Sequence, residues 1–132
     1  MKKIVLFAVA LACSGAVAQE KQVWACQQEV ATILGWDKSG WTQDEGVDVN
    51  FLLTINENLT AAVKSVGDTS EANLTCEIAP ESYLSCLDNT KSMHFLFNSA
   101  QKRLGFSSLY GSMDTDNKRE PVSARIYTCV KF

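Results

Sequence analysis

Period-two alternation of side chains constrains the fold of this chain more than any other feature. Residues 92–111 hold two alternating stretches joined by a polar turn at 98–102. One face of the first stretch carries Met93, Phe95 and Phe97, and one face of the second carries Leu104, Phe106, Ser108 and Tyr110. Alternation of this period is typical of half-buried β-strands. We therefore expect a hairpin here, at the centre of a β core.

Further strand-like stretches cover 23–36, 47–55, 59–66, 74–78, 83–87 and 121–131, with turn residues between them. In the first, residues 27–34 also fit a short helix, but β-branched residues favour one long strand. Six side chains of this stretch fit one side of such a strand: Trp24, Cys26, Val30, Thr32, Leu34 and Trp36. No pattern for a long helix occurs. We expect an all-β fold, either a single antiparallel β-sandwich or a small barrel of about eight short strands.

The first 18 residues have the order of a secretory signal peptide. Lys2 and Lys3 precede an apolar run, and Ala16-Val17-Ala18 forms a small-x-small cleavage site. We expect residues 1–18 to be a signal peptide and residues 19–132 to form one domain, periplasmic or secreted by a bacterium. An alternative is a lipoprotein acylated at Cys13. The alanine three residues before that cysteine, where leucine is more usual, favours cleavage after Ala18.

Charge and hydropathy argue against several classes of partner. The full chain has a net charge of -3, and loss of Lys2 and Lys3 would leave 10 basic and 15 acidic residues, a net charge of -5. An acidic chain without a basic stripe is a poor partner for nucleic acid or for anionic membrane surfaces. No stretch after residue 18 approaches the ~20 apolar residues of a membrane-spanning helix, so we expect no membrane span. The oligomeric state stays open.

Four cysteines remain after residue 18: Cys26, Cys76, Cys86 and Cys129. An even number in an exported chain predicts two disulfides, for which three connectivities are possible. We favour Cys76 with Cys86, which flank a short turn, and Cys26 with Cys129, which lie near the two ends of the domain. No cysteines are closely spaced, and His94 is the only histidine, so the sequence argues against a zinc site. We expect no cofactor.

Catalytic patterns are lacking in the sequence. His94 falls on the strand face opposite Phe95, and no nucleophile elbow, phosphate loop or dinucleotide fingerprint occurs. The run Asp114-Thr115-Asp116-Asn117 approaches a calcium loop, but Lys118 and Arg119 stand where a ligand and a glycine are needed. We therefore expect that the protein is not an enzyme.

Trp36 and Trp41 flank a tight turn, Asp37-Lys38-Ser39-Gly40. Aromatic side chains are frequent in binding hot spots, but in small β domains they more often fill the core. We favour core packing for this pair and keep both tryptophans as the candidate partner surface.

Several short motifs occur in a fixed order along the chain. They are the run Gly35-Trp36-Asp37-Lys38-Ser39-Gly40-Trp41, the strand Phe95-Leu96-Phe97-Asn98 followed by Leu104-Gly105-Phe106 and Tyr110-Gly111, the acidic loop 114–117, and the ending Cys129-Val130-Lys131-Phe132. In combination they resemble a pattern in small exported bacterial proteins of unknown function. The resemblance spans most of residues 19–132. It implies a β fold and assigns no catalytic residue.

These features together favour a non-enzymatic periplasmic protein-binding module. Its expected partner is another envelope or secreted protein, and an inhibitor-like or immunity-like role against a cell-wall enzyme or a toxin would suit its size. Two alternatives remain. One is a small β-barrel that binds an apolar ligand in its interior, which eight strands are sufficient to enclose. The other is a structural component of the envelope.

Overall fold

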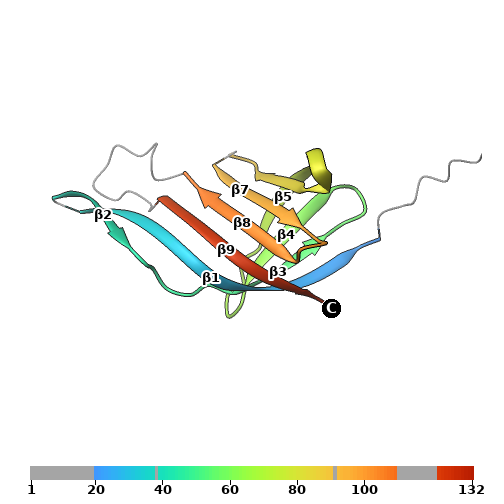
Figure 1. Cartoon of the computed structure of the whole chain (residues 1–132), viewed down its shortest axis with the longest axis horizontal. Coiled ribbons are helices and arrows are strands. Elements are labelled where there is room, and N and C mark those ends of the chain that lie inside the picture. Colours follow the sequence, from blue (N-terminus) through green and yellow to red (C-terminus); the bar gives the residue numbers. More distant parts are fainter. Residues whose placement is uncertain (1–19, 38, 91, 110–121) are drawn as a thin grey trace, which may run out of the picture.

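The structure, a computed structural model, describes residues 20–37, 39–90, 92–109 and 122–132. Within these ranges the alternating stretches form nine antiparallel strands (Figure 1). They are β1 (Gln22–Asp37), β2 (Gly40–Asp44), β3 (Phe51–Ile55), β4 (Thr60–Ser65), β5 (Ala72–Ile78), β6 (Leu84–Asp88), β7 (Met93–Asn98), β8 (Arg103–Ser108) and β9 (Val122–Lys131), with a short 3-10 turn at Pro80–Ser82. The predicted all-β fold is confirmed. No helix among the described residues is long and apolar enough to cross a membrane.

Eight of the strands close into a barrel. From β3 to β9 each strand pairs with the next along the chain, β1 pairs with β3, and β9 returns to pair with β1. The remaining strand, β2, pairs only with the C-terminal part of β1. Figure 1 shows this β1–β2 arm projecting past the end of the barrel at which β8 ends and β9 begins. The choice between sandwich and barrel, left open by the sequence, is thus settled as a barrel.

Inward-facing side chains fill the barrel. Aromatic rings meet edge to face, with ring centroids 5.0 Å apart for Trp24 and Phe97 and 4.6 Å apart for Phe51 and Tyr127. The hairpin of β7 and β8 contributes from both strands, which confirms its predicted place in the core. The buried set is Trp24, Cys26, Phe51, Leu53, Ile55, Ala61, Leu74, Cys76, Leu84, Cys86, Phe95, Phe97, Leu104, Tyr127 and Cys129.

Two disulfides join directly opposed residues of neighbouring strands. Cys26 of β1 is bonded to Cys129 of β9, where the barrel closes, and Cys76 of β5 is bonded to Cys86 of β6. The favoured connectivity is therefore confirmed. Intramolecular disulfides persist in oxidising compartments, so this pair of bonds points to an extracytoplasmic environment.

A β-bulge divides β1 into two parts. Gln28 lies opposite Tyr127 of β9 and Val30 lies opposite Ile126, which leaves Glu29 without an opposite residue. Because strand side chains alternate with period two, one extra residue turns the rest of the strand over. Val30 is consequently 55% exposed on the outside of the barrel. The prediction that Val30 shares one side of the strand with Trp24 and Cys26 is wrong for this reason.

Residues 45–50 form an irregular connection from β2 to β3, so that 47–50, predicted as the start of a strand, lie outside β3. Gly46 has a positive φ of 70°, which departs from strand geometry. The side chain of Gln28 then holds the connection, because its Nε2 donates to Asp48 Oδ1 at 3.1 Å. The backbone N–H of Gln28 donates to Asn50 Oδ1 at 3.0 Å. Side chains thus replace strand pairing at this edge of β1.

Asp88 organises the connection between β6 and β7. Its Oδ1 accepts hydrogen bonds from the backbone N–H groups of Ser92 and Met93, each at 2.9 Å, and Thr90 donates to its other carboxylate oxygen. Desolvation raises the pKa of Asp88, but these hydrogen bonds to the charged form outweigh it. The pKa therefore lies below its ordinary value.

Removal of the β1–β9 disulfide should destabilise the protein more than removal of the β5–β6 disulfide. The bonded cysteines are 103 and 10 residues apart in sequence. Loop-closure entropy then predicts losses of about 5 kcal/mol for Cys26→Ala with Cys129→Ala and about 3 kcal/mol for Cys76→Ala with Cys86→Ala. Urea unfolding of the two double variants measures both losses. Equal losses would contradict the entropic ranking.

Asp88→Asn should lower the free energy of unfolding at neutral pH by about 1–2 kcal/mol, because the amide has one uncharged acceptor oxygen for Ser92 and Met93 and cannot accept from Thr90 at its nitrogen. A carboxyl whose pKa is lowered on folding stabilises the protein above its unfolded pKa, and this contribution disappears as the pH falls through the folded-state value. The difference in free energy of unfolding between wild type and variant should therefore shrink as the pH falls below 3.8, the ordinary pKa of an aspartate. Urea unfolding across this pH range measures it, and a difference that grows on acidification would refute the assignment.

Candidate functional site

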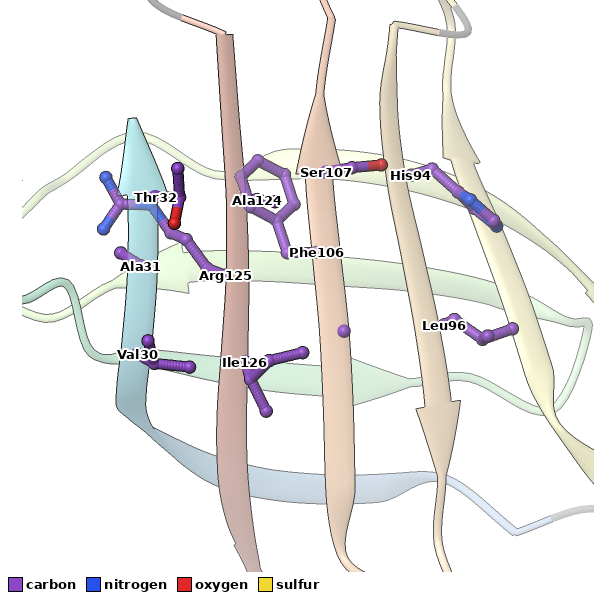
Figure 2. A pocket seen from close by; sticks show the side chains of 11 residues that line it. Val30, Ala31, Thr32, His94, Leu96, Phe106, Ser107, Ala124, Arg125 and Ile126 are labelled. Carbon is purple, nitrogen blue, oxygen red and sulfur yellow. The ribbon is translucent and has the colours of Figure 1, made fainter. Parts of the chain in front are cut away.

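The outside of the barrel carries a row of apolar residues across four strands. The register places Leu96, Gly105, Ile126 and Val30 next to one another on β7, β8, β9 and β1 (Figure 2). We call these four residues the apolar row. Leu96 is 39% exposed and Ile126 is 37% exposed. Gly105 has no side chain, so the surface is hollow between its two large neighbours.

A second row runs parallel to the apolar row, two residues further along each strand. It consists of His94, Ser107, Ala124 and Thr32, which are small or polar (Figure 2). The two rows line a shallow groove of about 370 Å³. The groove therefore has one apolar side and one polar side.

The bulge residue Glu29 borders the apolar row on its other side. Its carboxylate accepts a hydrogen bond from Arg103 Nη2 at 2.7 Å and another from the hydroxyl of Thr128. The ion pair is about half exposed, and exposed pairs contribute about 1 kcal/mol or less to stability. Its structural effect is to place polar groups at this border, so that the apolar row lies between two polar margins.

The same outward face continues onto the β1–β2 arm. Leu34 follows Val30 on this face and is 38% exposed. Trp36 and Trp41, the predicted partner surface, lie opposite each other in the arm. Trp41 is 43% exposed rather than buried in the core, whereas the side chain of Trp36 lies outside what the structure describes. A role of this pair in partner binding stays a prediction.

Ser85 and His94 are the described side chains that most resemble a catalytic pair, with 2.9 Å between Ser85 Oγ and His94 Nε2. A serine nucleophile also needs a third group that orients the histidine and donors that stabilise an oxyanion. Among the described residues, no other hydrogen bond to the His94 ring occurs. We therefore interpret the Ser85–His94 contact as a hydrogen bond between neighbouring strands, β6 and β7.

Metal binding also finds no support in the described ranges. They contain no group of three or more His, Cys, Asp or Glu side chains that could hold a metal ion. The calcium-like run 114–117 lies outside these ranges. The main chemical feature of the described outer surface is therefore the apolar row with its two polar margins.

Sequence reasoning did not find the apolar row. The alternation groups Val30 with Trp24 and Cys26, and it gives no sign that Leu96 and Ile126 lie next to Val30. The available clue was the polar run Gln27-Gln28-Glu29, which interrupts the alternation of the strand at the bulge.

No protein-family profile, curated protein or solved structure matches this chain. The resemblance to small exported bacterial proteins therefore stays a prediction. Conclusions about function rest on the surfaces of this barrel and on the chemistry of their side chains.

Val30→Ser and Ile126→Ser should each change the free energy of unfolding by no more than about 0.5 kcal/mol, because both side chains lie outside the barrel. Leu104→Ala provides the comparison: Leu104 is 1% exposed, and truncation of a buried leucine costs about 2–5 kcal/mol. Urea unfolding measures all three. A loss for Val30→Ser as large as that for Leu104→Ala would place Val30 in the core and contradict the bulge.

Proposed function

We propose that this chain is a non-enzymatic protein-binding module of the inhibitor or immunity type. Its partner is another envelope or secreted protein, which it contacts through the apolar row and the adjoining arm. The observation that carries this proposal is the exposure of aligned apolar side chains on the outside of a barrel closed by a disulfide.

The apolar row has the composition of a small interface. Contiguous exposed apolar surface marks interaction sites in soluble proteins, and interfaces have an apolar centre within a polar rim. Here the centre is Leu96, Ile126 and Val30, and the rim is formed by the His94 row and by the Glu29–Arg103 pair. Paired strands also hold the row in fixed positions, which limits the entropy lost on association.

The expected compartment follows from the disulfides and from the N-terminal sequence. Two intramolecular disulfides are suited to an oxidising environment. Cleavage after Ala18 would deliver the chain to the periplasm or the medium, and acylation at Cys13 would be the alternative route. Both residues lie outside the described ranges. An inhibitor or immunity protein of such a compartment needs stability and a binding face, and it needs no catalytic groups.

The acidic character of this chain suggests which kind of residue surrounds the apolar patch of the partner. The chain is acidic, and the carboxylates of Asp44, Glu45 and Asp48 are exposed where the arm leads back to β3. Within the described ranges none of these three makes an ion pair. A partner with basic groups around its apolar patch would be attracted by this surface, with an association rate that falls as salt is added.

Affinity capture with matched variants tests the proposal. The oxidised exported protein serves as bait for envelope and medium extracts, and any retained protein is purified and its Kd is measured by calorimetry. Val30→Asp should weaken binding by at least about tenfold, because it buries a charge at the interface centre. Ile78→Asp is the control, since Ile78 is an exposed apolar residue of β5 outside the row. Equal effects of the two variants, or capture of nothing, would contradict the proposal.

The inhibitory or immunity role needs a separate measurement. The captured protein is assayed for its own activity, cell-wall hydrolysis or toxicity, with and without one equivalent of the module. We expect the wild type to reduce this activity and Val30→Asp to lose the effect. Undiminished activity in a stable complex would leave a binding module and exclude inhibition.

A further inference from the structure

A second hollow lies at the end of the barrel where β8 ends and β9 begins. It has a volume of about 340 Å³ and is lined by inward-facing residues of β3, β4, β5, β7, β8 and β9. It shares Phe106 and Arg125 with the lining of the outer groove, but no residue of the apolar row lines it. We call this hollow the barrel mouth.

Aromatic rings form the floor of the barrel mouth. Phe51, Phe95 and Tyr127 are buried, and the ring of Phe51 meets those of Phe95 and Tyr127 at centroid distances of 5.9 and 4.6 Å. Phe106 packs beside Phe95 at 4.7 Å. Such a floor would accept the apolar body of a small molecule, either a ring or a short acyl chain.

Polar groups gather on one wall of the barrel mouth. Ser108 and Ser123 lie directly opposite each other on β8 and β9, and Arg125 follows Ser123 on the same inward face. Opposed residues of paired strands have Cβ atoms about 5 Å apart, so the two serines are neighbours, and Arg125 lines the same hollow. In the described part of the chain, neither serine hydroxyl makes a hydrogen bond to a protein group. Both remain available to a ligand.

Arg125 makes no ion pair with the described residues. Its guanidinium donates to Gln28 Oε1 and, at 3.0 Å, to the carbonyl oxygen of Val47, both neutral acceptors. Burial raises the pKa of the neighbouring Tyr127, although Arg125 opposes the shift, so the phenol is neutral at physiological pH. The ion pair within the described ranges is that of Arg103 with Glu29, on the outer surface.

We infer that the barrel mouth binds a small amphipathic monoanion. Its apolar body rests on the floor of Phe51, Phe95 and Tyr127, and its carboxylate or sulfonate head meets Arg125 and the two serines. A guanidinium with spare N–H donors suits such a head, since charge-assisted hydrogen bonds are the stronger ones. The volume is near the lower end of the ~300–1,000 Å³ typical of ligand pockets, which indicates one small molecule. This inference does not depend on the proposed function.

Two fluorescent probes with the same ring system test the inference. Anilinonaphthalene sulfonate carries the anionic head, and phenylnaphthylamine is its neutral counterpart. We expect the native protein to bind one equivalent of the sulfonate at least about tenfold more tightly than the amine, the size of effect given by a charged hydrogen bond. Octanoate and phenylacetate, added as competitors, then distinguish an acyl from an aromatic body. Equal affinity for the two probes, or no binding of either, would overturn the inference.

Variants assign the site. Arg125→Gln should remove the preference for the anionic probe and leave the affinity for the neutral probe unchanged. Lys131→Gln is the matched control, because it removes a positive charge from an exposed residue at the other end of β9 and should alter neither affinity. Ser108→Phe should fill the barrel mouth and weaken both probes. Equal effects of Arg125→Gln and Lys131→Gln would show that the sulfonate senses only overall charge.

Arg125 also supports the 45–50 connection through Val47, so Arg125→Gln could fail to fold. Arg125→Lys keeps the charge, and it should retain part of the preference for the anionic probe. Far-ultraviolet circular dichroism and urea unfolding check each variant before titration. A folded Arg125→Lys with no preference, together with an unaffected Ser108→Phe, would place probe binding elsewhere and refute the site.

Discussion

The pairing of β1 with β9 is the constraint on which the rest of the structure depends. A meander of antiparallel strands has two free edges until its first and last strands meet, and closure removes both. Here the pairing runs from Trp24 with Lys131 to Leu34 with Val122, and the Cys26–Cys129 disulfide fixes it near one end. Closure gives the inward residues of all eight strands a common interior. The aromatic core can form only because these two strands, distant in sequence, are joined.

The bulge at Glu29 lets one strand serve two environments. Before it, β1 contributes Trp24 and Cys26 to the core. After it, the strand remains paired with β9 as far as Leu34 and pairs with β2 from Ile33 onward. The extra residue exposes Val30 and so completes the apolar row. Gln28, beside the bulge, accepts a hydrogen bond from Arg125 at the barrel mouth. One local irregularity therefore supports both the outer surface and the inner polar cluster.

Much of this fold could be predicted from the sequence, because the patterns that determine it are local. Alternation located most strands, and the spacing of Cys76 and Cys86 around a turn indicated their bond. The closure of the sheet and the bulge could not be predicted, since both depend on the register between β1 and β9, about a hundred residues apart. The outward turn of Val30 follows from that register. Arg125 was likewise unremarkable in the sequence, because most of the residues around it at the barrel mouth come from other strands and loops.

The filled interior limits where this barrel can act. Eight strands enclose a space that side chains can fill completely, and bulky residues such as Trp24, Phe51 and Phe97 occupy it here. A ligand buried at the centre would have to displace these rings and forfeit their contacts, at a cost of several kcal/mol for each aromatic side chain lost from the core. A binding partner or ligand would therefore have to meet this protein at the outer surface or at the end of the barrel. The two places differ in chemistry, since one offers apolar side chains within a polar border and the other an arginine and aromatic rings that line one hollow.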